Sequence, residues 1–171
     1  MQPSGEALPV HDAIERYRSQ GTQLIVVAGA DYGGGSSRDW AAKGPALAGV
    51  RAIIAESFER IHRSNLIGMG ILPLQFAHGM TRHDLALDGT ESFSVRGMKG
   101  ELQPMQSVIL VVSRKDGRAE EFPLQLRVQT AREIEYLKCG GLLPYVLEQL
   151  LASNAGVSSD ADGPRSRMQA Q

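Results

Sequence analysis

Three consecutive glycines, at 33–35, are separated by two residues from the end of a short apolar run in this chain. The run, TQLIVVAGA at 22–30, is rich in β-branched residues, which favours a buried strand over a helix. After the glycines, RDWAAKGPAL at 38–47 predicts a short helix, whose length Gly44 and Pro45 limit. The sequence therefore predicts a strand that passes through a glycine turn into a helix.

The same alternation continues to residue 76. VRAIIAE at 50–56 predicts a second buried strand, the segment 57–69 predicts a helix, and ILPLQF at 71–76 predicts a third strand. A further short helix at 11–20 precedes the first strand. Strand, helix, strand, helix and strand in succession are typical of an α/β protein.

The second half of the chain has strand patterning of a different kind. TESFSVRG at 90–97 and the stretch 107–129 both predict strands, and Lys-Asp-Gly at 115–117 is a hairpin signal within that stretch. This part should therefore be antiparallel. A helical segment at 131–151, broken by Gly-Gly at 140–141, follows it. We predict a mixed sheet with flanking helices.

Length and composition fit one domain with short extensions. The chain has 171 residues, of which 42% are hydrophobic and 22% charged, so it can bury a core. We predict an N-terminal extension at 1–10, a domain at 11–151 and a disordered tail at 152–171, where the sequence is polar and small. No apolar run approaches the roughly 18 to 20 residues that span a bilayer, so we expect a cytoplasmic protein with no membrane partner.

Charge and cysteine content argue against several kinds of site. Eighteen basic and nineteen acidic side chains give a formal charge of −1, which disfavours binding of nucleic acid through a general positive field. The single cysteine, Cys139, excludes an internal disulfide. One thiolate by itself cannot hold an iron–sulfur cluster or a multi-cysteine zinc site. We therefore expect this chain to bind no metal and no cofactor of its own.

The glycine turn and the residues after it have the chemistry of an anion site. Glycines allow the backbone to approach a ligand closely, and the first N–H groups of a helix are unpaired and favour negative charge. Ser36, Ser37 and Arg38 add two hydroxyls and a guanidinium fork at this point. The spacing matches neither a P-loop nor a dinucleotide-binding turn. The alternative is that one serine only caps the helix while Arg38 pairs with a surface acid.

Two blocks of sequence closely resemble the C-terminal swivel domain of the aconitase family. They are YGGGSSRDWAAKG at 32–44 and VRAIIAESFERIHRSNLIGMGILPLQF at 50–76, and the likeness extends from about residue 11 to about residue 151. The resemblance implies a layered β/β/α domain that closes over a cluster-bearing catalytic core. This expected architecture agrees with the α/β reading of the residues.

The resemblance also implies roles for the residues of the glycine turn. Ser36 matches the catalytic base, an alkoxide that removes the proton from the carbon α to a carboxylate. Gly35, Ser37 and Arg38 match the group that binds a substrate carboxylate. A helix N-terminus and a guanidinium could stabilise such an alkoxide. We expect Trp40, the only tryptophan, to pack this helix onto its neighbours.

Family members complete the site with a four-iron four-sulfur cluster on other domains. The resemblance therefore implies a cluster-bearing core as partner, whether a separate large subunit or the rest of a longer chain, and an inactive chain in its absence. The implied substrate is a tricarboxylate, either citrate and isocitrate through cis-aconitate or 2-methylcitrate. The segment 81–97 looks like the branch of iron–sulfur-dependent 2-methylcitrate dehydratases.

The alternative function is a non-catalytic binding module for a tricarboxylate or for RNA. In cytosolic relatives the swivel domain contributes to an RNA-facing cleft, so Arg60, Arg63 and Asn65 would contact phosphate. The pattern alone favours a helix that packs Ile61 and Leu66 against the sheet while its charges are solvated. Together with the net charge, this leaves RNA binding as the less favoured reading.

Overall fold

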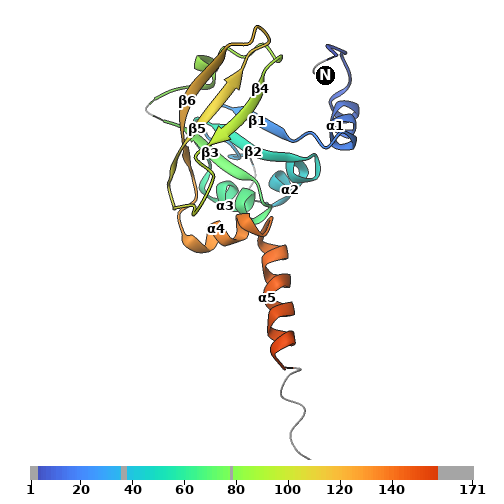
Figure 1. Cartoon of the computed structure of the whole chain (residues 1–171), viewed down its shortest axis with the longest axis vertical. Coiled ribbons are helices and arrows are strands. Elements are labelled where there is room, and N and C mark those ends of the chain that lie inside the picture. The colour runs from blue at the N-terminus through green and yellow to red at the C-terminus, as the bar shows by residue number, and fades with distance from the viewer. Residues whose placement is uncertain (1–3, 36–37, 78, 158–171) are drawn as a thin grey trace, which may run out of the picture.

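The computed structural model describes residues 4–35, 38–77 and 79–157 (Figure 1). The first half of the chain alternates helices with strands, as the apolar runs predict. Its elements are α1 (Val10–Ser19), β1 (Leu24–Ala28), α2 (Trp40–Leu47), β2 (Val50–Ala55), α3 (Arg60–Gly68) and β3 (Leu72–Phe76).

The second half supplies the antiparallel strands and two further helices. A hairpin joins its two longest strands through the Lys-Asp-Gly turn. The elements are the 3-10 helix η1 (Arg82–Leu85), β4 (Ser92–Arg96), β5 (Ser107–Ser113), β6 (Ala119–Leu126), α4 (Ala131–Lys138) and α5 (Leu142–Val157).

All six strands form one mixed sheet in the order β1-β2-β3-β6-β5-β4. Strands β1, β2 and β3 are parallel, with Ile53 of β2 opposite Val26 of β1 and Pro73 of β3. Strand β6 pairs antiparallel with β3 and with β5, and β4 pairs antiparallel with β5 at the edge. The α/β class and the mixed sheet predicted from the sequence are confirmed.

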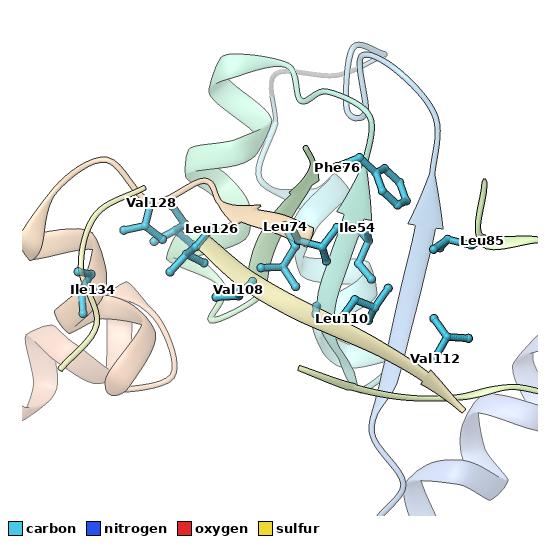
Figure 2. Close-up of a cluster of buried hydrophobic side chains, with 13 residues drawn as sticks. Ile54, Leu74, Phe76, Leu85, Val108, Leu110, Val112, Leu126, Val128 and Ile134 are labelled. Carbon is cyan, nitrogen blue, oxygen red and sulfur yellow. The ribbon is translucent and has the colours of Figure 1, made fainter. Parts of the chain in front are cut away.

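Two apolar clusters cover the two faces of the parallel strands. On one face Ile53 of β2 packs with Leu66 of α3 and Ala42 of α2. On the other face Ile54 shares a cluster with Leu110 of β5, although β3 and β6 separate these strands in the sheet (Figure 2). The antiparallel strands must therefore curl over the parallel ones, which produces the β/β/α layering.

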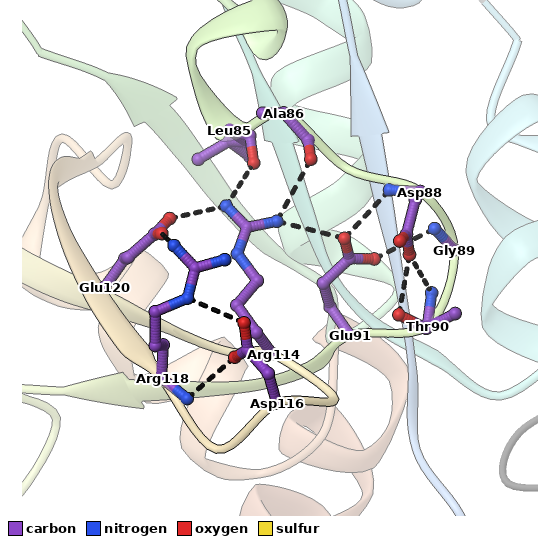
Figure 3. A network of polar contacts seen from close by, with 10 residues as sticks. All are labelled: Leu85, Ala86, Asp88, Gly89, Thr90, Glu91, Arg114, Asp116, Arg118 and Glu120. Carbon is purple, nitrogen blue, oxygen red and sulfur yellow. Dashed lines mark hydrogen bonds and ion pairs between the residues drawn. The ribbon is translucent and has the colours of Figure 1, made fainter.

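A guanidinium whose side chain is 12% exposed fastens the segment after β3 to the β5–β6 hairpin (Figure 3). Arg114 donates to the carbonyls of Leu85 at 2.6 Å and Ala86 at 3.1 Å. It also pairs with Glu91 at 3.0 Å and with Glu120 on β6. Because a charge that is largely removed from water is costly unless paired, this network holds η1 and the chain beyond it in one place.

Three details differ from the sequence predictions. The helix predicted from residue 38 begins at Trp40, and that side chain is 66% exposed, with Lys43 Nζ 4.5 Å above its ring, rather than packed on its neighbours. Helix α5 runs to Val157, so the predicted tail boundary after Leu151 falls inside a helix. Residues 158–171 lie outside the described ranges. Of the helices in those ranges, none is long and apolar enough to cross a membrane.

Candidate functional site

The predicted anion loop lies at the carboxyl edge of the parallel strands, where ligand sites of open α/β sheets occur. Strand β1 ends at Ala28, and the loop 29–39 leads from it to α2. The neighbouring strand β2 ends at the same edge, where the Glu56 N–H donates to the Gly29 carbonyl at 3.2 Å. The loop therefore begins against the chain that follows β2.

Asp31 and Ser57 clamp these two segments together. The Asp31 N–H donates to Ser57 Oγ at 2.7 Å, and the Ser57 hydroxyl donates to Asp31 Oδ1 at 3.1 Å. Asp31 has φ +53°, a left-handed conformation that costs energy for a residue with a Cβ. Next along the chain, the Tyr32 N–H donates to Ser57 O, and Tyr32 O accepts from Glu59 N–H, both at 3.0 Å. The first part of the loop is thus fixed to the start of α3.

The glycines that follow leave the loop open to solvent. Gly33 has φ +92°, and a Cβ there would lie 2.1 Å from His62 Cγ, so only glycine fits. The Gly34 N–H closes a tight turn on Asp31 O at 3.0 Å. Gly35 is exposed, and a Cβ built on it would have no heavy atom within 4 Å. A ligand can therefore reach the backbone at Gly35.

Arg38, which the resemblance assigns to carboxylate binding, is exposed just before helix α2. Its carbonyl accepts from the Ala41 N–H at 3.4 Å, so it belongs to the turn that opens the helix. The N-cap is Asp39, whose side chain makes no capping hydrogen bond. Ser36 and Ser37 lie outside the described residues, so their roles as base, ligand or cap stay predictions.

His62 lies beneath the loop, a role that the sequence did not indicate. Its side chain is 1% exposed and meets the Tyr32 ring edge to face, with centroids 5.2 Å apart. Burial lowers the pKa of His62 below its ordinary value of 6.5, and the charge of Glu59 opposes this only in part. The ring is therefore neutral at neutral pH.

The three residues considered for RNA contact have different surroundings. Arg60 is exposed at the start of α3, and Asn65 is half-buried. Arg63 is 6% exposed, and its guanidinium pairs with both carboxylate oxygens of Glu133, at 2.9 and 3.2 Å, and with the Arg127 carbonyl at 2.9 Å. A phosphate contact by Arg63 would require breaking this buried pair, so the prediction does not fit this residue.

Arg82 is a second guanidinium at the same edge of the sheet that sequence reasoning missed. It pairs with Glu56 at 3.6 Å, and a Cβ at Gly29 would lie 2.1 Å from its Nη1, so the guanidinium rests on the end of β1. In the sequence, this arginine is marked only by a polar run, Thr-Arg-His-Asp at 81–84, that follows the third predicted strand. A cavity of about 290 Å³ opens beside it, lined by Val27, Arg82, His83, Ala86 and Leu87.

The buried imidazole predicts a pH dependence of stability. Because the pKa of His62 is lower in the folded chain than in the unfolded chain, the unfolded state binds the extra proton as the pH falls below about 6.5. The free energy of unfolding of the native chain should therefore fall relative to that of His62→Phe as the pH decreases from 6.5. Urea titrations between pH 7.5 and 5 measure this difference. His83→Gln, at an exposed histidine, is the matched control, and parallel curves for the native chain and His62→Phe would contradict the prediction.

The described residues show no group of three or more His, Cys, Asp or Glu side chains placed to hold a metal ion. The described part of the glycine loop offers exposed backbone, a helix N-terminus and the Arg38 guanidinium, a combination suited to a carboxylate or another small anion.

Known proteins match both the sequence and the fold. Residues 1–79 match the model of the aconitase C-terminal domain. The chain is 55% identical over 149 residues to aconitate hydratase A of Pseudomonas aeruginosa. The aligned residues make up 87% of this chain and 16% of that protein. It is 50% identical over 149 residues to aconitate hydratase A of Escherichia coli, and this alignment takes in 87% of this chain and 17% of that protein.

A crystal structure of 3-isopropylmalate dehydratase from Methanocaldococcus jannaschii has the same fold, with a TM-score of 0.52 at 19% identity over 91% of this chain and 87% of that chain. The layered sheet and the glycine loop at its carboxyl edge thus define a swivel domain of the aconitase type. The chain belongs to the aconitase family as a C-terminal domain. It spans about 16% of the length of the Pseudomonas aeruginosa relative.

Proposed function

We propose that this chain is the swivel domain of an aconitate hydratase, which dehydrates citrate and rehydrates cis-aconitate to isocitrate. The observation that carries the proposal is the 55% identity to an aconitate hydratase A over 87% of the chain. The exposed glycine loop supports it, since the loop presents Gly35 and Arg38 where a substrate carboxylate could bind.

In this proposal the residues of the loop have separate roles in substrate binding and in proton removal. Arg38 binds one carboxylate of the substrate through its two-pronged guanidinium, with Gly35 and Ser37 beside it. Ser36 removes the proton from the carbon α to that carboxylate. The positive end of α2 and the Arg38 charge lower the cost of the serine alkoxide.

The proposal requires a catalytic core that carries the four-iron four-sulfur cluster. The cluster would supply a Lewis acid for the hydroxyl that leaves, and the single Cys139 of this chain cannot hold it. Large apolar side chains stand exposed where a core could cover them, among them Trp40 at 66%, Leu47 at 60% and Leu143 at 77%. Whether the core is a separate subunit or part of a longer chain does not change these roles.

A domain exchange tests the function. The C-terminal domain of Pseudomonas aeruginosa aconitate hydratase A is replaced by residues 11–157 of this chain, and hydration of cis-aconitate is assayed without oxygen. We expect the chimera to be active and the truncated core alone to be inactive. A folded, cluster-loaded chimera without activity would contradict the proposal. Assays with 2-methylcitrate in parallel decide whether that substrate is preferred.

Arg38→Lys in the same chimera tests the carboxylate site. An ammonium group cannot reproduce a bidentate guanidinium contact, so KM should rise by about tenfold or more with a smaller change in kcat. Arg96→Lys, on the edge strand β4 and in an exposed ion pair with Glu121, is the control and should change neither constant. An unchanged KM in Arg38→Lys would remove this residue from the site.

A further inference from the structure

His62 joins the exposed loop to the rigid part of the fold. It lies in the first turn of α3, where its backbone N–H donates to the Glu59 side chain at 2.8 Å and so fixes the start of the helix. One turn further on, Leu66 anchors the same helix in the apolar cluster against the sheet. The imidazole therefore belongs to a well-anchored element.

Gly33 rests directly on this imidazole. A Cβ built at Gly33 would lie 2.1 Å from Cγ and 2.3 Å from Cδ2 of His62, far inside van der Waals contact. The backbone and the ring thus fill complementary space, with no room between them for a side chain. The Tyr32 ring closes the side of the contact, at an interplanar angle of 62° to the imidazole.

The surface of the ring, rather than hydrogen bonding, makes this contact. Nδ1 and Nε2 of His62 are both buried, and neither has a hydrogen-bond partner among the residues that the structure describes. Because protein interiors are close-packed, removing the ring would leave a void directly under the loop. The position of Gly33 therefore depends on the volume and flatness of the side chain at 62.

We propose that His62 is a positioning residue of the candidate site, whose ring supports the backbone at Gly33 and thereby sets where the loop presents the backbone of the neighbouring Gly35. Because helix α3 is anchored against the sheet, the ring on this helix fixes the position of a loop that is otherwise exposed. The effect on substrate rests on the proposed function, whereas the support of the loop stands on the geometry alone.

Hydrogen exchange of the full chain tests the support directly. The Tyr32 and Gly34 N–H groups donate to Ser57 O and Asp31 O, so they report on the loop. In His62→Ala these two amides should exchange at least about tenfold faster than in Leu66→Ala, after correction for global stability. Leu66→Ala is the matched control, because it removes a fully buried side chain from the same helix one turn beyond His62 and leaves the imidazole under Gly33 in place. Equal exchange in the two variants would overturn the proposal.

Two further variants keep the test decisive if His62→Ala does not fold. His62→Phe retains a flat ring and should keep both amides within about threefold of the native rate. Gly33→Ala pushes a Cβ into the ring from the loop side and should accelerate the same two amides. Fast exchange in His62→Phe, or native exchange in Gly33→Ala, would overturn the proposal.

The active chimera adds a functional measurement. His62→Ala should raise KM for cis-aconitate more than Leu66→Ala does, and His62→Phe should restore it, since a displaced Gly33 moves the adjoining backbone at Gly35 away from the substrate. An inactive chimera with the native sequence would count against the proposed function only, because the exchange result does not depend on it. An active chimera in which both alanine variants have the same KM would overturn the positioning role.

Discussion

Ser36→Ala should lower kcat of the active chimera by about 10²- to 10⁴-fold while leaving KM within a few-fold of the native value. A general base acts only as the proton leaves, so its removal affects the transition state more than the bound substrate. Steady-state kinetics with citrate and with isocitrate, both of which lose a proton at this step, measure the effect.

Ser94→Ala is the matched control for this variant, because Ser94 is an exposed serine on the edge strand β4. It should leave both kinetic constants unchanged. A kcat for Ser36→Ala within about threefold of the native value would show that this serine is not the base. A rise in KM with unchanged kcat would move Ser36 into the group that binds the carboxylate.

The strands and the glycine loop could be predicted because their signals are local. Each parallel strand is a short apolar run bounded by turn residues, so the alternation of such runs with helical segments was enough to predict the α/β class. The three glycines at 33–35 marked the turn, and Gly33 adopts the positive φ that such a turn needs. The curl that brings Leu110 over Ile54 has no local signal, because it depends on strands far apart in sequence.

The buried face of α3 could not be predicted, since its partners are distant in the chain. Apolar periodicity placed Ile61 inside, whereas the structure leaves it 41% exposed and buries His62 and Arg63 instead. Arg63 can be buried because its guanidinium forms an ion pair with Glu133, which lies 70 residues further along the chain. Trp40 is exposed although it is apolar, because no other part of the described chain covers it.

Glu133→Ala should lower the free energy of unfolding of the full chain by about 3 to 5 kcal/mol, since it leaves the buried Arg63 guanidinium without its carboxylate. The side chains of this pair are 7% and 16% exposed. Burial works to raise the pKa of Glu133, but hydrogen bonds from Arg63 and from the Gln129 N–H hold that pKa below its usual range. The folded chain therefore holds the ionised carboxylate. Urea denaturation measures the change.

Glu135→Ala, on the same helix α4, is the control. Its ion pair with Lys138 has the same kind of contact, at 3.0 Å, but both side chains are about half exposed. Such pairs contribute about 0 to 1 kcal/mol, so this variant should stay close to native stability. Equal losses from Glu133→Ala and Glu135→Ala would mean that burial of the first pair does not matter.

A double variant separates the unpaired charge from the loss of the pair itself. Arg63→Met combined with Glu133→Leu removes both charges and keeps apolar volume, so it should recover most of the stability that Glu133→Ala loses. Such recovery would mean that the pair specifies how α3 meets α4 rather than adding net stability. Hydrogen exchange at Tyr32 and Gly34 would then show whether the pair also governs the loop, because α3 carries His62 beneath Gly33. If the double variant is as unstable as Glu133→Ala, the attraction within the pair contributes the stability directly.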